Sequence, residues 1–322
     1  MMKQTCKLIS VSLVMILALA ACTPREVPAS LSASTSVSSP AAASITFTDA
    51  LGRTVTVNEP KKVAAVNGSY AEVWLLAGGE LAAVTEDAWY ERSLALPEET
   101  VSLGAMKAPN MEQILAEGID FVLLSSKVAE HVKLLDTLEA AGVSCAYFEV
   151  ETFDDYLAML KICTDITGKP EMYEANGTHV EERIQTAIAR SEGKPSPTVL
   201  FIRAFSTGAK AKGSDNMTGI MLKELGCTNI ADSETGLLED VSIEKVIAED
   251  PDYIFVVTMG ESSEKAIDAL EKNLISNPAW VGLSAVKNNR YVVLPKELFH
   301  YKPNARWGES YEMLADILYG KE

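Results

Sequence analysis

The chain has 322 residues, of which 48% are hydrophobic, enough apolar material for the cores of two domains of ordinary size. Acidic residues outnumber basic ones, and the formal net charge is −17 at pH 7. A nucleic-acid-binding protein needs a basic face to displace counterions from phosphates, so this composition excludes that class. The hydrophobic content also excludes a chain that is disordered throughout.

The first residues have the pattern of an export signal. Lys3 and Lys7 precede an apolar run that has the length of a signal-peptide core and is too short for a spanning helix. The run ends in Leu-Ala-Ala-Cys22, which resembles the lipobox of bacterial lipoproteins. We therefore predict a lipoprotein signal peptide over residues 1–22, with Cys22 acylated and the mature chain held on the extracytoplasmic face of the cell membrane. An uncleaved anchor and an ordinary signal peptide are the alternatives.

Residues 23–43 are rich in serine, alanine and proline, so they are expected to form a disordered tether that buries no core. The cysteines beyond this segment, Cys145, Cys163 and Cys227, lie in apolar contexts and are expected to be small buried hydrophobic residues. No CxxC motif and no Cys/His spacing in the sequence indicates a metal site.

Alternating strand and helix patterns predict an N-terminal α/β lobe over residues 44–168. Residues 45–57 have the pattern of a β-hairpin, and a helix is expected to begin at Ser69 as its N-cap. Further strands are expected near residues 61–67, 81–87, 121–124 and 143–150, and further helices near residues 111–117, 127–142 and 153–168. Such alternation is typical of a parallel sheet that helices cover on both faces.

Residues 169–195 predict one long, rigid α-helix, because apolar residues recur at helical spacing and Gly and Pro stand mainly at the ends. The alternation then restarts in a C-terminal α/β lobe over residues 196–322. Strands are expected near residues 198–203, 227–231, 253–257 and 290–294, and helices near residues 216–226, 243–250, 262–273 and 305–320. The predicted fold class is α/β, with two Rossmann-like lobes that contain parallel sheets and are joined by a single rigid helix.

One helix-to-strand unit occurs twice. The segment IEKVIAEDPDYIFVV at residues 243–257 repeats MEQILAEGIDFVLL at residues 111–124. Glu112 matches Glu244, and Asp120 matches Asp252. Each copy places a glutamate in the first turn of a helix and ends in an apolar run, one copy in each expected lobe.

The order of these segments resembles the substrate-binding proteins of ABC importers that take up ferric siderophores, haem and vitamin B12. The resemblance rests on DALGRTVTV followed by KKVAAVNGS, on the two repeated segments and on the single interlobe helix. It implies capture of a metal chelate, first a ferric siderophore and next haem or a corrinoid, with no permanently bound cofactor. It also implies a monomer that delivers the chelate to a two-fold symmetric permease with its ATPase. Glu112 and Glu244 fall where this family engages permease arginines; the alternative is that both are solvated helix-start glutamates favoured by the helix dipole.

The ligand site is expected where parallel strands end, because ligands of open α/β sheets bind at the carboxyl ends of the strands. Cations there would meet carboxylates, phosphates or catecholates, and aromatic rings would add flat apolar contact. The alternative is that the cations, Lys302 among them, only cover loops and pair with acids. The candidate ligand-binding residues are Asn67, Tyr70, Trp89, Tyr90, Ser125, Lys127, Arg203, Phe205, Met259, His300, Tyr301 and Arg306.

His300 is a candidate axial ligand of haem iron, with Met259 or Tyr70 opposite, or an ordinary loop residue. His131 and His179 lie on predicted helices and are expected to be structural or solvated. With so few histidines, an importer of bare zinc or manganese is not expected. The sequence contains no GxSxG, HExxH or P-loop motif, so we do not expect an enzyme. A lipid-anchored sensor or surface-binding protein on the same scaffold remains the alternative function.

Overall fold

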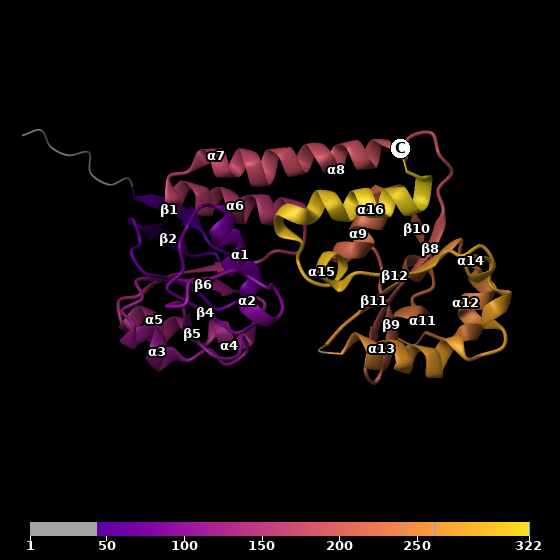
Figure 1. Cartoon of the computed structure of the whole chain (residues 1–322), viewed down its shortest axis with the longest axis horizontal. Coiled ribbons are helices and arrows are strands. Elements are labelled where there is room, and N and C mark those ends of the chain that lie inside the picture. Colours follow the sequence, from indigo (N-terminus) through magenta and orange to yellow (C-terminus); the bar gives the residue numbers. More distant parts are fainter. Residues whose placement is uncertain (1–43, 240, 261, 322) are drawn as a thin grey trace, which may run out of the picture. The chain divides into compact units, whose positions relative to one another are not determined.

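The computed structural model describes residues 44–239, 241–260 and 262–321 (Figure 1). The expected signal peptide, the tether through residue 43 and Cys22 lie outside the described residues. Within them, no helix combines the length and the apolar character that crossing a membrane requires.

The N-terminal lobe contains a parallel sheet in the strand order β5-β4-β3-β6-β7, preceded by the antiparallel hairpin β1-β2. The hairpin pairs Ile45 with Val57 and turns at Asp49, whose side chain accepts hydrogen bonds from the backbone amides of Leu51 and Arg53. The strands are β1 (Ile45–Thr48), β2 (Thr54–Val57), β3 (Val63–Ala65), β4 (Ala83–Val84), β5 (Val101–Ser102), β6 (Phe121–Ser125) and β7 (Ser144–Phe148).

Two helices of this lobe differ from the expectation. Helix α1 begins two residues earlier than predicted, because Asn67 and not Ser69 is the N-cap; its side chain accepts from the amides of Ser69 and Tyr70. The helix expected over residues 127–142 is broken into α4 and α5. The helices are α1 (Gly68–Leu76), α2 (Asp87–Tyr90), α3 (Met111–Ala116), α4 (Ala129–Val132), α5 (Leu135–Ala140) and α6 (Phe153–Thr167).

The segment expected to connect the lobes is helical but not a regular α-helix. It consists of α7 (Pro170–Tyr173), the π-helical turn η1 (Glu174–Thr178) and α8 (His179–Ala189). At the π turn, Gly177 lies so close to α6 that a Cβ atom would come within 3.0 Å of the Leu157 side chain. Asn176 there donates to the carbonyl of Leu76 and accepts from the hydroxyl of Tyr156. The π turn therefore fastens the connecting helix to the N-terminal lobe.

The C-terminal lobe contains the strand order β10-β8-β11-β12, all parallel, and the unpredicted strand β9 pairs antiparallel with β8. Strand β8 is longer than expected and contains Arg203 and Phe205. The strands are β8 (Thr198–Phe205), β9 (Gly208–Ala211), β10 (Thr228–Asn229), β11 (Tyr253–Thr258) and β12 (Tyr291–Leu294). The helices and helical turns are α9 (Met217–Glu224), α10 (Ile230–Ser233), α11 (Gly236–Glu239), α12 (Ile243–Glu249), α13 (Ser263–Leu270), η2 (Glu271–Ile275), η3 (Trp280–Gly282), α14 (Ser284–Lys287), α15 (Lys296–Phe299), η4 (Asn304–Arg306) and α16 (Trp307–Tyr319).

The repeated sequence unit is repeated in the structure. Asp120, just before β6, accepts hydrogen bonds from the backbone amides of Lys61 and Lys62 at 2.8 and 3.0 Å. Asp252, just before β11, accepts from the amide and the hydroxyl of Thr198, both at 2.9 Å. Each aspartate thus joins the start of one strand to the start of the neighbouring strand, β3 in one lobe and β8 in the other.

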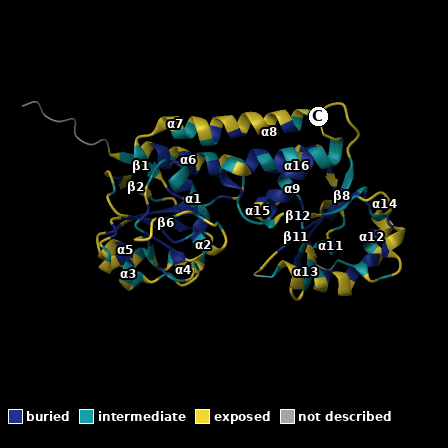
Figure 2. Ribbon diagram, in the orientation of Figure 1, coloured by how far each residue is buried: buried dark blue, intermediate teal, exposed yellow. Residues whose placement is uncertain are grey.

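The central strands of the two sheets are the most deeply buried elements. Strands β6 and β11 are buried at every residue, whereas the outer faces of the covering helices are exposed (Figure 2). Cys145, Cys163 and Cys227 are free and buried, as expected. Burial raises the pKa of the Cys227 thiol to about 12, so this side chain behaves as a small hydrophobic group.

Candidate ligand-binding site

Arg203 is the one predicted cation that forms no ion pair within the described residues. It lies near the carboxyl end of β8, makes no side-chain hydrogen bond or ion pair with any described residue, and its Nε atom is buried without a partner. Burial lowers the pKa of its guanidinium from the ordinary value, and the charge of Glu151 acts in the opposite direction. A half-buried guanidinium with a buried, unpartnered Nε atom is unfavourable, and such a group suits a site that an anion completes.

Further cations surround Arg203. The register of the β8-β9 pair places Lys210 opposite Arg203, and like charges in that position are unfavourable. The pKa of Lys212 is lowered first by burial and then by the charge of Arg203. The cationic cluster, as we name it, consists of Arg203, Lys210, Lys212, Lys296 and Lys302. It carries positive charge on a protein whose formal net charge is −17.

His300 lies against this cluster. Its pKa is lowered to about 4, first by burial and then by Arg203, Lys296 and Lys302, so the imidazole is neutral at neutral pH. Its ring lies 5.5 Å from the ring of Tyr301, and Lys296 lies over the face of Tyr301 at 5.4 Å. The Nδ1 atom of His300 is buried and has no partner among the described residues.

The other predicted cations form ion pairs. Lys127 pairs with Glu149 at 2.7 Å, Lys302 with Glu151 at 2.9 Å, and Arg306 with Glu309 through two bonds of 2.7 and 2.8 Å. Lys127 and Arg306 therefore behave as ordinary loop cations that pair with acids, which was the alternative to a role in ligand binding. Lys302 differs, because its partner Glu151 follows β7 of the other lobe and its charge also acts on His300.

The loop after α15 is fastened to the N-terminal lobe through Asn304. This residue is fully buried and has a left-handed backbone (φ 53°), which asparagine tolerates well. Its amide group donates to the carbonyl of Ser69 at 3.1 Å and to the carboxylate of Glu72 at 2.7 Å. Glu72 also forms an ion pair with Arg92. The carboxylate of Glu72, in the N-terminal lobe, therefore joins Arg92 to the loop after α15 in the C-terminal lobe.

Arg92 was not expected in the site. Its pKa is lowered to about 10, first by burial and then by the charge of Arg306, and Tyr301 also acts on it. Its Nε atom is buried and has no partner among the described residues. In sequence, Arg92 stands in an irregular stretch after a short helix, and no local pattern distinguishes it from a surface arginine. The same holds for Glu151 and Asn304, whose roles come from contacts across the lobes.

The predicted aromatic and apolar residues separate into buried and available groups. Tyr70 belongs to the core: it is 5% exposed, its hydroxyl donates to the carbonyl of Phe148, and burial raises its pKa to about 12. Tyr70 is therefore not placed to meet a ligand or haem iron. Trp89 and Phe205 are half-buried, whereas Tyr90 is 83% exposed and Met259 38% exposed.

Asn67 and Ser125 hold the backbone of the N-terminal lobe. Asn67 caps α1, and the hydroxyl of Ser125 accepts from the amide of Lys127 at 3.2 Å. His131 is fully buried; its Nδ1 atom accepts from the amide of Ser125, and its Nε2 atom lies 2.7 Å from the carbonyl of Met106. His131 therefore has a structural role.

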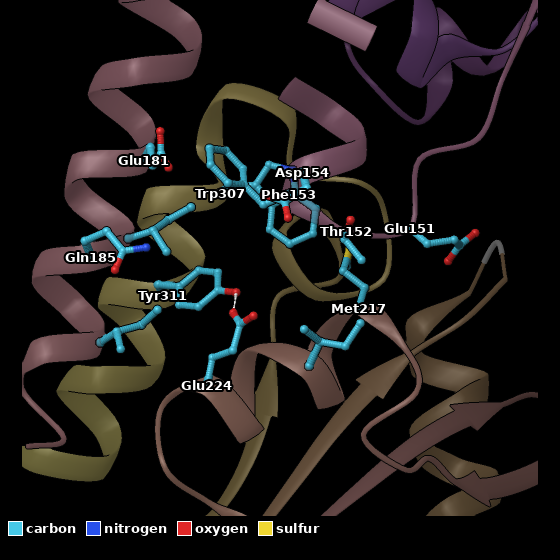
Figure 3. A pocket seen from close by; sticks show the side chains of 13 residues that line it. Glu151, Thr152, Phe153, Asp154, Glu181, Gln185, Met217, Glu224, Trp307 and Tyr311 are labelled. Carbon is cyan, nitrogen blue, oxygen red and sulfur yellow. Dashed lines mark hydrogen bonds between the residues drawn. The ribbon is translucent and has the colours of Figure 1, made fainter. Parts of the chain in front are cut away.

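Two hollows of the described residues differ in size. A cavity of about 180 Å³ is lined by residues in or just before α6 and by residues of α8, α9 and α16; its acids are Glu151, Asp154, Glu181 and Glu224 (Figure 3). It is smaller than ordinary ligand sites and carries the wrong charge for an anion. A second hollow of about 550 Å³ lies at the carboxyl ends of β11 and β12, and its lining contains Lys296 together with the acids Glu264, Asp268 and Glu297. Its volume is large enough for a small chelate, but its acids outnumber its one lysine, so the positive charge of the site comes from the cationic cluster, to which Lys296 also belongs.

The two repeated glutamates are exposed at equivalent places. Glu112 lies in the first turn of α3 after the N-cap Asn110, and Glu244 lies in the first turn of α12 after the N-cap Ser242. The hydroxyl of Ser242 donates to Glu244 at 2.8 Å, and hydrogen bonds lower the pKa of Glu244. Glu112 makes no side-chain hydrogen bond or ion pair with the described residues. Among those residues, no group of three or more His, Cys, Asp or Glu side chains is arranged to hold a metal ion.

Comparisons with known proteins agree with this architecture. No curated protein sequence matches the chain. Solved structures match it along most of its length at low sequence identity. Staphylococcus aureus SirA complexed with staphyloferrin B is 20% identical, with 85% of this chain and 97% of that chain covered and a TM-score of 0.64. A periplasmic heme-binding protein from Pseudomonas aeruginosa is 24% identical, with 81% and 93% covered and a TM-score of 0.63.

An ABC transporter substrate-binding protein from Listeria monocytogenes is 19% identical, with 82% of this chain and 100% of that chain covered and a TM-score of 0.63. At these identities the likeness shows a shared α/β fold. The family model described as "Periplasmic binding protein" matches residues 63–298, which is most of the chain. Its members are binding proteins and not enzymes, as we expected for this chain. The chain belongs to the periplasmic binding protein family.

Proposed function

We propose that the protein is the lipid-anchored, extracytoplasmic substrate-binding component of an ABC importer, and that it captures an anionic iron chelate, a ferric siderophore. The observation that carries this proposal is Arg203, a half-buried guanidinium that forms no ion pair with the described residues and whose Nε atom is buried without a partner. Family membership supports a binding role. The fold shared with SirA, whose structure contains staphyloferrin B, supports the class of ligand.

The chemistry of the cationic cluster suits a chelate with carboxylate or catecholate oxygens. The planar guanidinium of Arg203 can donate two parallel hydrogen bonds to such a group, and Lys210 and Lys212 add charge beside it. Partial burial strengthens each of these interactions relative to water. A siderophore already surrounds its iron with donor atoms, so the protein needs no metal ligand of its own.

Haem is the second candidate, and His300 is the observation that favours it. With a pKa of about 4 the imidazole is neutral at neutral pH, the form that binds iron. However, a metal-binding imidazole usually donates its second ring nitrogen to a fixed acceptor, and the buried Nδ1 of His300 has no partner among the described residues. The propionates of haem would meet the same cationic cluster.

Delivery to a permease completes the proposal. Cys22 would carry the lipid that keeps the monomer near the membrane. Glu112 and Glu244, exposed at matching places of the repeated unit, would each meet an arginine of a two-fold symmetric permease. A two-fold partner requires the same contact twice, and the repeat provides it.

A binding screen on the purified mature chain tests the function. Intrinsic tryptophan fluorescence is measured against a ferric hydroxycarboxylate siderophore, a ferric catecholate, haemin and cyanocobalamin. We expect saturable quenching by at least one anionic iron chelate and none by cyanocobalamin, which offers no carboxylate. Absence of binding to every chelate would contradict the proposal and favour a lipid-anchored sensor. Haemin binding with a Soret band that is lost in His300→Ala would replace the siderophore with haem.

A further inference from the structure

The repeated helices expose matching aliphatic side chains as well as matching glutamates. Leu115 on α3 is 42% exposed, and Ile247 on α12 is 41% exposed. Each stands three residues after its glutamate, Glu112 or Glu244. The other large hydrophobic side chains exposed in the described residues, Tyr90, Met259, Val281 and Val293, lie outside the repeat.

The pattern of exposure along the two helices is the same. The residue before each exposed aliphatic, Ile114 in α3 and Val246 in α12, is 0% exposed and packs into the core of its lobe. Leu115 and Ile247 therefore do not serve the core. The alanine that follows each of them is also exposed. Positions three and four residues apart share one helix face, so a glutamate, an aliphatic side chain and an alanine form one exposed face in each lobe.

We propose that Leu115 and Ile247 are a pair of apolar anchors for the permease, one in each lobe. This inference rests on the proposed function. The permease would present a basic side chain next to an apolar socket at each of two symmetry-related places. A cation is required because Glu112 makes no ion pair with the described residues and hydrogen bonds hold Glu244 ionised. A socket is required because burying an exposed aliphatic side chain in the contact is favourable.

The two kinds of contact have different dependence on salt. Exposed charge pairs increase the association rate and weaken as salt screens them. Burial of Leu115 and Ile247 is not screened, so the anchors maintain the complex at high ionic strength. Each half of a two-fold symmetric partner needs both an acidic and an aliphatic contact. This explains why the aliphatic position is repeated together with the glutamate.

The test uses the mature protein and the permease–ATPase complex of the same genome, reconstituted in lipid nanodiscs. Binding is measured by biolayer interferometry from low to high salt for wild type, Leu115→Ser, Ile247→Ser and Glu112→Gln/Glu244→Gln. We expect roughly tenfold weaker binding for each serine variant at every salt concentration. The glutamine double variant should lose affinity at low salt and approach wild type at high salt.

Val281→Ser is the matched control, because Val281 is 67% exposed and lies outside the repeat. It should bind as wild type does. All variants should retain the wild-type melting temperature and chelate affinity, since the substituted side chains do not serve the core or the cationic cluster. Serine variants that bind like the control would overturn the anchor inference, while a defect of the glutamine variant would leave the proposed function standing. Absence of binding by wild type would overturn both.

Discussion

His300 and Arg203 lie close together near the carboxyl end of the C-terminal sheet, and each affects the ionisation of the site. Burial lowers the pKa of His300 to about 4, and the charge of Arg203 is the next cause. The imidazole thus stays neutral beside a cluster of cations. An anion that enters would remove part of this repulsion and raise the pKa of His300.

The affinity for an anionic siderophore should therefore rise as the pH falls. If the bound anion raises the pKa of His300 above about 4, binding takes up a proton, and the affinity increases between neutral pH and about pH 5. We expect an increase of about two- to tenfold in this interval, and a smaller one in His300→Gln. Titration calorimetry in buffers of different ionisation enthalpy measures the proton uptake directly.

A haem-binding role predicts the opposite dependence of ligand affinity on pH. Iron ligation requires the neutral imidazole, so haemin affinity would stay level or fall as the pH decreases toward 4. Proton release, or no uptake, on binding of the anionic chelate would contradict the electrostatic account of the site.

The stability of the free protein should decrease in mild acid. In the unfolded chain, His300 has its ordinary pKa of 6.5 and binds a proton below that pH. In the folded protein its pKa is about 4, so it stays neutral until the pH falls to about 4. Burial lowers the pKa of His131 in the same direction. We expect His300 to account for about 1 to 3 kcal/mol of lost unfolding free energy between pH 6.5 and pH 4, after allowance for partial exposure.

Urea unfolding at several pH values measures this loss. His300→Gln should have a flatter profile of unfolding free energy against pH than wild type, and His179→Gln, at an exposed position of the connecting helix, is the control variant. Equal profiles for all three proteins would show that His300 titrates normally.

The repeated aspartates should contribute similarly to stability. Asp120→Ala removes two hydrogen bonds to the amides before β3, and Asp252→Ala removes the bonds to Thr198 at the start of β8. Each substitution should lower the unfolding free energy by about 1 to 2 kcal/mol, measured by urea unfolding. Asp268→Ala, at an exposed position whose side chain makes no hydrogen bond to the described residues, is the control and should be neutral. A loss in only one lobe would mean that the two units are not equivalent.

The repeated glutamates should serve uptake and not binding. Glu112→Ala and Glu244→Ala should leave the affinity for the chelate unchanged, since both residues are exposed at helix starts and neither forms an ion pair with a member of the cationic cluster. Uptake of radiolabelled iron by cells that carry the variants should fall, and charge reversal to lysine should reduce it further, because it opposes a permease arginine with a second cation. Weaker chelate binding by the purified variants would contradict the docking role.

The sequence predicts most of the fold because its signals are local. Alternating apolar patterns locate β6 and β11, and the repeat of Glu112 and Asp120 in the second lobe is visible in the sequence. Strand β9 was missed, since Gly208–Ala211 has no apolar alternation and forms only by pairing with β8. The π turn at Glu174–Thr178 was missed for a similar reason: it depends on packing of Gly177 against α6.

The site is less predictable from the sequence, because its properties come from contacts between distant segments. Arg203 and His300 were identified from their places after strands, but the sequence does not distinguish the unpaired Arg203 from the paired Arg306. Tyr70 was wrongly expected to face a ligand, since its hydroxyl binds the carbonyl of Phe148 in the core. Asn304 was missed because its partners lie in the other lobe, and Arg92 because its partner Glu72 lies on a different segment, α1, of its own lobe.

The most direct test is the affinity of Arg203→Gln for the anionic iron chelate that binds the wild type best. Removing a half-buried cation that forms no ion pair should not lower the unfolding free energy, so a loss of binding cannot be ascribed to misfolding. Arg306→Gln, whose guanidinium is exposed and paired with Glu309, is the matched control. We predict that tryptophan quenching gives at least a tenfold weaker affinity for Arg203→Gln and a change of less than about twofold for Arg306→Gln. Wild-type affinity in Arg203→Gln would contradict the claim that this guanidinium receives the chelate.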